Sequence, residues 1–224
     1  MKHRFLLPFL TIILLFRASK ATVLEKKGQC VDVDAYFAVP DEPEQPIQRD
    51  QPGNCGGDGW TNFTRPSGEW CIKIFYEDDI TQAAAEKECQ AQGATLSGFQ
   101  NMMEVQWAAA MSTIGIYPRT GSIWVGLKRR EDCLNVGRTK NCTGMNSFQW
   151  TDRSASGTDG MLWSCGQPDN SRLYQHCAVL QASPISYLAG FQTGTLDDVS
   201  CELKRTNKNM LRAVVGYVCG RRAQ

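Results

Sequence analysis

The residues best suited to do chemistry are carboxylates and amides that lie near cysteines in the last third of the chain. Two follow Cys165, one lies two positions before Cys177, and two lie three and four positions before Cys201. These five residues are Gln167, Asp169, Gln175, Asp197 and Asp198. Disulfides can hold their side-chain oxygens in place, and oxygen is the ligand that a hard cation such as Ca²⁺ prefers. The pattern predicts a Ca²⁺ site, unless residues 167–170 form only a turn and the two aspartates cap another.

The N-terminus has the composition of an export signal. Lys2 and Arg4 precede an apolar run over residues 5–16, and Ser19 and Ala21 supply the small residues of a cleavage site. The run is too short to span a bilayer, and no segment of about 20 apolar residues follows it. We therefore expect residues 1–21 to be a signal peptide and the protein to be secreted without membrane insertion. An uncleaved anchor is the alternative.

The charge of the remaining chain argues against nucleic acid as a partner. Four of the 24 Lys and Arg residues lie in residues 1–21 and none of the 23 Asp and Glu residues does, which leaves a net charge of about −3. A nucleic-acid-binding protein is expected to have a basic face. The chain also lacks P-loop and hydrolase motifs, and His176 is its only histidine beyond residue 21. We expect a protein that is not an enzyme.

All ten cysteines lie beyond residue 21, which is typical of a disulfide framework in an oxidising compartment. Their number is even, so every cysteine can pair. Zinc binding is the alternative, but no two cysteines have the close Cys-x₂-Cys spacing of a zinc site.

Composition divides the chain into three parts. After the signal peptide, residues 22–54 form an N-terminal segment, within which residues 40–52 are rich in proline and polar side chains and read as an extended linker. A folded domain is expected over residues 55–221, which is a usual size for one domain.

The first helix of this domain is expected after a cap at Asp78 or Asp79 and should run to about Gln92. Gly93 follows as a helix-ending residue, and Cys89 should face the core.

A second helix is expected from the cap residue Asn101 to about Ser112, since Glu104 three positions later completes a capping box. Its apolar face is predicted to contain Val105, Ala108, Ala109 and Met111. The pair Met102 and Met103 in the first turn is interpreted as core or staple packing.

Short apolar runs later in the chain predict strands. Together with an earlier run they cover residues 70–75, 123–127, 148–150, 178–180 and 214–218. The basic residues 128–130 are interpreted as a solvated loop edge. Two early helices and several late strands indicate an α+β domain.

The elements, in this order, resemble a C-type lectin-like domain of the long form. Residues 55–60 and 70–75 resemble its N-terminal hairpin, Trp124-Val125-Gly126-Leu127 its central strand motif, and residues 148–152 the segment that enters its long loop. The resemblance covers about residues 55–221. It implies an α+β fold with two helices, short antiparallel sheets, a long loop region and stabilising disulfides. The insert from Cys133 to Cys142 and the loop at residues 157–160 resemble secreted nematode members.

The resemblance also implies how most of the cysteines pair. The implied disulfides are Cys55–Cys71, Cys89–Cys219, Cys133–Cys142 and Cys177–Cys201. Cys30 and Cys165 are left over. They can pair with each other, or Cys30 can bridge two chains in an oligomer.

In sugar-binding members of the family, one Ca²⁺ is ligated by side chains that also hydrogen-bond two sugar hydroxyls. By position, the implied Ca²⁺ ligands and sugar-binding residues here are Gln167, Asp169, Gln175, Asp197 and Asp198. Pro168 would be the cis proline of the site. The order Gln167-Pro168-Asp169 resembles galactose-type members, and Tyr174 is the nearest aromatic residue for stacking on a sugar. Any Ca²⁺ affinity is expected in the weak extracellular range of about 10⁻⁴–10⁻³ M.

Three positions depart from the family's pattern. Gln175 stands where the binding members usually have Glu, Asp197 where they have Asn, and Leu196 where they have Trp. The carboxylate count is kept, but an amide oxygen cannot ligate as a bidentate carboxylate does.

Two functions are therefore expected for the long loop. The first is Ca²⁺-dependent binding of glycans on microbial or host surfaces, as in innate immunity, with terminal galactose as the sugar that the resemblance suggests. The alternative is a Ca²⁺-independent protein-interaction module on the same fold. Asn62-Phe63-Thr64 is an N-glycosylation sequon in an expected surface hairpin, so the protein is predicted to be a glycoprotein modified at Asn62.

Overall fold

The computed structural model describes residues 54–184, 187–188, 191–203 and 212–224. The predicted signal peptide, the linker and Cys30 lie outside the described residues. Within the described part, no helix is long and apolar enough to cross a membrane.

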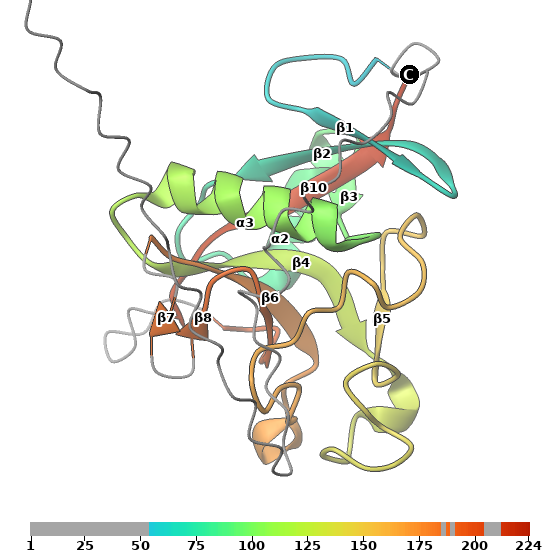
Figure 1. The fold of residues 1–224 in the computed structure, drawn as a ribbon, viewed down its shortest axis with the longest axis vertical. Helices are drawn as coiled ribbons and strands as arrows, with labels where there is room; N and C mark the ends of the chain where they lie inside the picture. The colour runs from blue at the N-terminus through green and yellow to red at the C-terminus, as the bar shows by residue number, and fades with distance from the viewer. Residues whose placement is uncertain (1–53, 185–186, 189–190, 204–211) are drawn as a thin grey trace, which may run out of the picture.

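One mixed sheet forms the frame of the domain (Figure 1). Its strands run in the order β1-β2-β10-β4-β6-β9, with β3 beside β10 and β5 beside β4. The strands are β1 Thr61–Arg65, β2 Gly68–Phe75, β3 Thr95–Leu96, β4 Gly121–Arg129, β5 Phe148–Trp150, β6 Cys177–Ala182, β9 Leu196–Val199 and β10 Val214–Arg222. A separate two-stranded sheet pairs β7 Tyr187–Leu188 with β8 Phe191–Gln192.

The sheet is not wholly antiparallel as expected, because β4 and β10 are neighbours that run parallel. The last strand of the chain therefore lies at the centre of the sheet, between β2 and β4. The α+β class is confirmed.

The first helix, α2, spans Gln82–Ala91. Its cap is Thr81, whose side chain accepts a hydrogen bond from the amide of Ala84, so the predicted cap at Asp78 or Asp79 is wrong. Asp79 instead lies in a turn with a φ of 63°. Cys89 is fully buried, as predicted.

The second helix, α3, spans Met102–Ile116 and is capped by Asn101, as predicted. It is longer than expected, and two of its methionines differ from the prediction. Met103 and Met111 are exposed rather than in the core. Short 3-10 turns occur at η1 Glu131–Cys133 and η2 Ser171–Leu173.

Apolar side chains fill both faces of the sheet, and one helix covers each face. On β4, Ile123, Val125 and Leu127 join the cluster that includes residues of α3, whereas Trp124 joins the cluster that includes residues of α2. This alternation follows from the two-residue period of a strand. Figure 1 shows α3 across the front of the sheet and α2 behind it.

Four disulfides form between the residues that the family resemblance implied. They are Cys55–Cys71, Cys89–Cys219, Cys133–Cys142 and Cys177–Cys201. The second joins α2 to β10 across 130 residues, so in the chain-entropy model it contributes on the order of 4–5 kcal/mol. Cys165 is also disulfide-bonded.

A buried ion cluster joins the hairpin, α3 and the start of the long loop. Arg65 donates to both oxygens of Glu104, at 2.9 and 2.7 Å, and to Asp152 Oδ2 at 3.0 Å. Asp152 also accepts hydrogen bonds from the amides of Ser154 and Ala155, just after β5. The cluster therefore fixes the point at which the chain leaves the sheet to form the long loop.

Candidate functional site

The long loop runs from the end of β5 to the start of β6, over residues 151–176. Its Gln167–Pro168 peptide bond is cis, as the family resemblance implied. The sequence predicted a cage of five oxygen-bearing side chains around this bond.

Asp198 lies at the centre of the predicted cage, and both of its oxygens already have partners. Oδ1 accepts from the amide of Asp169 at 3.0 Å, and Oδ2 accepts from the amide of Asn170 at 2.8 Å. Oδ2 also pairs with Arg129 Nη2 at 2.5 Å. The residue is fully buried, and burial raises the pKa of its carboxyl group, although these amide and guanidinium partners lower it. Asp198 thus holds the backbone that follows the cis proline.

Arg129 supplies the cation for Asp198. Its Nε donates to the backbone oxygen of Gln175 at 2.9 Å, and its guanidinium lies 4.5 Å from the ring centroid of Phe148. Burial lowers the pKa of Arg129, and the charge of Asp198 opposes that shift. One side chain therefore connects β4, β5, β9 and the end of the long loop.

The prediction that residues 128–130 are a solvated edge is wrong for Arg129, whose side chain is 2% exposed. A signal for its burial was present in the sequence. Arg129 is two positions beyond Leu127 in the same strand, so the strand period directs it to the same face as Val125 and Leu127.

Asp197 lies apart from the turn that the other predicted ligands form. Its Oδ2 accepts from Gln181 Nε2 at 3.2 Å and pairs with Arg212 Nη1 at 3.1 Å, whereas its buried Oδ1 has no hydrogen-bond partner. Burial raises the pKa of Asp197 to about 6, although Arg212 lowers it.

The other three predicted ligands cap the turn that follows Pro168. Gln167 Oε1 accepts from the amide of Asp169 at 3.1 Å. The amide of Ser171 donates to Asp169 Oδ1 at 2.9 Å and to Gln175 Oε1 at 2.5 Å. These oxygens are therefore already engaged in holding the backbone of residues 169–171.

The donor set does not fit a Ca²⁺ ion in this arrangement. Ca²⁺ requires six to eight oxygens directed to one point. Here both oxygens of Asp198 already accept hydrogen bonds, one of them from the guanidinium of Arg129, and Asp197 is paired elsewhere. Across the described residues, no three His, Cys, Asp or Glu side chains are grouped so that they could hold a metal ion.

The turn itself has an unusual backbone. Asn170, Arg172 and Leu173 have φ values of 50°, 58° and 59°, in the left-handed region that costs an L-residue about 1–2 kcal/mol. Such conformations persist only where the surroundings hold them, and they concentrate at functional sites.

Asn170 anchors this turn from within. Its Nδ2 donates to the backbone oxygens of Leu134 and Val136, both at 2.8 Å, and its Oδ1 accepts from the amide of Gln175 at 3.1 Å. The insert closed by Cys133–Cys142 therefore supports the turn, a role that sequence reasoning missed.

The outer surface of the turn consists of Ser171, Arg172, Leu173 and Tyr174, all exposed. We call these four residues the recognition turn. Leu173 is 47% and Tyr174 49% exposed, so two large apolar side chains face solvent on a held backbone. Tyrosine and arginine are also the residue types that are enriched at binding hot spots.

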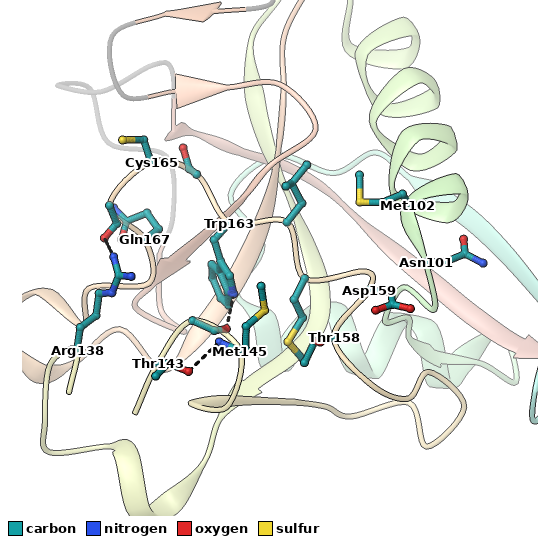
Figure 2. Close-up of a pocket in the computed structure, with 15 residues that line it drawn as sticks. Asn101, Met102, Arg138, Thr143, Met145, Thr158, Asp159, Trp163, Cys165 and Gln167 are labelled. Atoms are coloured by element: carbon teal, nitrogen blue, oxygen red, sulfur yellow. Dashed lines mark hydrogen bonds between the residues drawn. The ribbon is translucent and has the colours of Figure 1, made fainter. Parts of the chain in front are cut away.

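A pocket of about 730 Å³ lies beside the long loop, and Gln167 is one of the residues that line it (Figure 2). Met102, Met145, Met161, Leu162 and Trp163 provide its apolar lining. Trp163 is largely buried, donates from Nε1 to Gly144 O at 2.7 Å and packs against Phe148 at 4.9 Å between ring centroids. Its role is therefore packing, and Tyr174 is the aromatic residue that the loop presents to solvent.

Asn62 lies in β1, where its Nδ2 donates to Glu69 Oε2 at 2.5 Å. A glycan would be attached at this same nitrogen. Glycosylation of Asn62 stays a prediction.

Comparisons with known proteins give a family model and several similar proteins. A family model described as C-type lectin domain-containing protein 141/158 matches residues 61–222. Lymphocyte antigen 75 of Homo sapiens is 30% identical over 105 residues, which are 45% of this chain and 5% of that protein. Lymphocyte antigen 75 of Mesocricetus auratus is 32% identical over 123 residues, or 53% of this chain and 6% of that protein. The chain thus spans only a small part of the length of these relatives.

Several solved structures are also similar to this chain, at TM-scores below 0.5. The mouse scavenger receptor C-type lectin carbohydrate-recognition domain is 20% identical with a TM-score of 0.46, covering 75% of this chain and 96% of that one. Human lithostathine is 20% identical with a TM-score of 0.49, covering 80% and 99%. A calcium-independent type II antifreeze protein is 19% identical with a TM-score of 0.45, covering 75% and 95%.

Proposed function

Because the chain belongs to the C-type lectin domain-containing family, we propose that it is a secreted recognition protein whose recognition turn binds a partner without Ca²⁺. The observation that carries this proposal is the pairing of buried Asp198 with the guanidinium of Arg129. In the Ca²⁺-dependent reading of the loop, the metal would neutralise this carboxylate and hold the loop. Here the charge and the hydrogen bonds come from the chain itself.

Three further contacts support a turn that is formed in advance of binding. Asp198 holds the amides of Asp169 and Asn170, and Asn170 in turn holds the insert. A turn ordered before binding loses less entropy when it meets its partner. Residues 171–174 can therefore act as a rigid contact surface.

The chemistry of the recognition turn suits a partner with an apolar surface next to an anionic or hydrogen-bonding group. Leu173 and Tyr174 supply apolar area, and Arg172 supplies a cation that no carboxylate of the described residues pairs with. A protein surface presents such groups together more often than a single sugar does. We therefore place a protein partner first.

Ca²⁺-dependent glycan binding, including the galactose type, is the second candidate. The grouping of Gln167, Asp169, Gln175 and Asp198 around one turn favours it. For Ca²⁺ to bind, Arg129 would have to leave Asp198 and the amide oxygens of Gln167 and Gln175 would have to turn from the backbone.

Thermal unfolding with Ca²⁺ or EDTA separates the two candidates. A site with a Kd of about 10⁻³ M would be stabilised by about 1.4 kcal/mol at about 10 mM Ca²⁺. For a domain of this size that corresponds to a rise in Tm of about 3–6 °C. We expect no difference between Ca²⁺ and EDTA, and no retention on galactose or mannose resin. A rise in this range together with Ca²⁺-dependent retention would establish the second candidate instead.

Binding of the labelled protein to panels of microbial and host cells in EDTA tests the recognition turn. We expect Tyr174→Ala and Leu173→Ser to reduce cell binding at least tenfold. Met145→Ser is the matched control, because Met145 is 57% exposed but lies outside the turn. Equal binding by the turn variants and the control would refute the assignment of the surface.

A further inference from the structure

The outward face of α3 is apolar along its whole length. Met103, Ile114 and Tyr117 are 65%, 69% and 72% exposed, and Met111 is 40% exposed. Ala110 lies on the same face, and half-buried Trp107 borders it while packing against Phe63 at 5.3 Å between ring centroids. We call the five residues of this face, without Trp107, the α3 stripe.

The opposite face of α3 is apolar as well. Val105, Ala108, Ala109 and Ile116 belong to the core beneath the helix. The one charged residue of α3, Glu104, is buried and pairs with Arg65. The other polar residues of α3, Gln106, Ser112 and Thr113, are buried or half-buried, so its exposed surface is apolar. Figure 1 shows α3 as an outer element, with the sheet on one side only.

Tyr76 extends the stripe beyond the helix. Its ring lies against Gly115, where an added Cβ would come within 2.0 Å of the ring, and its hydroxyl donates to Met111 O at 2.8 Å. Tyr76 is itself 46% exposed. The apolar surface is therefore continuous from α3 onto the end of β2, and apolar patches of this kind mark interaction sites.

The charges around the stripe indicate what covers it. No ionisable Lys, Arg, Asp or Glu lies on the stripe, and Arg119 beyond its end is already paired with Asp78 at 3.0 Å. A helix that lies on a membrane surface carries Lys and Arg along its flanks, and α3 has none. A charged partner surface would bring unpaired charges onto this face. A second copy of the stripe is neutral and therefore matches it.

We infer that the α3 stripe is the contact surface of a homodimer in which two copies of α3 pack antiparallel about a two-fold axis. An isologous contact needs a self-complementary patch, and the small side chain of Ala110 near the middle of the stripe allows two helices to approach closely. In antiparallel packing the two helix dipoles also point in opposite directions, which is their favourable arrangement. From Met103 to Tyr117 the stripe is about 21 Å long at 1.5 Å per residue.

This length sets the expected strength of the dimer. One helix face with Tyr76 beside it buries less than the standard interface of about 1,600 Å². We expect a weak dimer, with a dissociation constant on the order of 10–100 µM. Two recognition turns on one dimer would gain avidity for a surface that carries many copies of a partner.

Sedimentation velocity over about 1–300 µM of the full secreted chain tests the inference. We expect a concentration-dependent dimer for the native protein. Ile114→Asp should weaken self-association at least tenfold, because it places a charge in the apolar contact. Met103→Lys, at the other end of the stripe, provides a second variant. Tyr174→Asp is the matched control, since it adds the same charge at a similarly exposed aromatic residue outside the stripe.

The antiparallel arrangement has its own test. It places Met103 of one copy opposite Tyr117 of the other. Met103→Lys and Tyr117→Glu should each weaken the dimer, and an equal mixture of the two should associate more strongly than either alone. An absence of this recovery would overturn the antiparallel arrangement.

Four outcomes would overturn the dimer. They are a monomer at all concentrations, a dimer that Ile114→Asp and Met103→Lys leave intact, a dimer that appears only after residues 22–53 are removed, and binding to phosphatidylcholine vesicles that Ile114→Asp abolishes. The third would mean that the chain's own N-terminal segment covers the stripe, and the fourth that a membrane does. Circular dichroism at matched concentration confirms that each variant is folded.

Discussion

Arg65 and Arg129 are both buried guanidinium groups, but they are neutralised in different ways. Arg65 faces two carboxylates, Glu104 and Asp152, and hydrogen-bonds both. Arg129 faces one carboxylate, Asp198, and completes its contacts with a backbone oxygen and the face of Phe148. The first cluster joins elements of the frame and the entry of the long loop. The second holds the turn that the loop presents to solvent.

This difference indicates how the fold separates stability from recognition. Loss of Arg65 would leave two buried carboxylates without a counter-charge, in contact with the sheet and α3. Loss of Arg129 would leave one, at the edge of the domain and next to a strained turn. The first change should therefore act globally and the second locally.

The largest effect is expected for Arg65→Met. Removing one member of a buried ion cluster typically costs about 3–5 kcal/mol, and here two carboxylates lose their partner, so we expect about 4 kcal/mol or more. Denaturant unfolding measures it. Arg119→Met is the control, because the Arg119–Asp78 pair is exposed and should be worth less than about 1 kcal/mol. Equal losses of stability in the two variants would mean that the buried Arg65 cluster contributes no more than the exposed Arg119–Asp78 pair.

Arg129→Met should cost less, about 3 kcal/mol at the low end of the range for a broken buried pair, because only Asp198 is left unpaired. Amide hydrogen exchange should accelerate at residues 169–175 and stay unchanged in β2 and β10. Arg130→Met is the control, since the side chain of Arg130 is 45% exposed. A uniform acceleration across the sheet would show that Arg129 belongs to the frame. In this variant, unlike the native protein, millimolar Ca²⁺ should recover part of the lost stability.

The Asp197–Arg212 ion pair is intermediate in burial between the buried clusters and the exposed ion pairs, because the side chain of Arg212 is 35% exposed. Burial raises the pKa of Asp197 to about 6, above the value of about 3.9 in an unfolded chain. The folded protein therefore binds this proton more tightly, and stability falls as the pH rises from about 4 to about 6 and stays lower above it.

Asp197→Asn should remove this pH dependence. We expect the difference in unfolding free energy between about pH 4.5 and about pH 7.5 to shrink by about 2 kcal/mol relative to native protein. Asp159→Asn, at an exposed carboxylate, should leave the native profile unchanged. An unaltered profile in Asp197→Asn would assign the pH dependence to Asp198, whose pKa burial also raises.

The smallest effect is expected in the turn itself. Arg172→Gly relieves a left-handed conformation but adds chain entropy to the unfolded state, so stability should change by less than about 1 kcal/mol. Binding to cells should nevertheless fall, because the exposed guanidinium is lost. A large loss of stability would mean that Arg172 supports the fold rather than recognition.

Much of the fold could be predicted from the sequence because its signals are local. The cysteine spacings, the Asn101 cap and the cis Pro168 each depend on neighbouring residues or on a motif order shared with the family. Thr81 was missed as a cap because Asp78 and Asp79 are equally good capping residues nearby, and only the path of the chain selects among them.

The candidate site was harder to predict because its charges are balanced over long separations. Asp198 pairs with Arg129, 69 positions earlier, and Arg65 with Asp152, 87 positions later. The carboxylates near the cysteines suggested a metal ion as their counter-charge. The sequence does not show that distant arginines supply this charge instead. The α3 stripe was missed for a related reason, because apolar residues on a helix do not show which face remains uncovered.

Amide hydrogen exchange of residues 169–175 in native protein, compared between EDTA and about 10 mM Ca²⁺, distinguishes a turn held by Arg129 from a turn held by a metal ion. If the guanidinium of Arg129 holds Asp198 and the turn, these amides exchange slowly and at the same rate in both conditions. Fast exchange in EDTA that Ca²⁺ slows would mean that a metal ion, rather than Arg129, holds the turn.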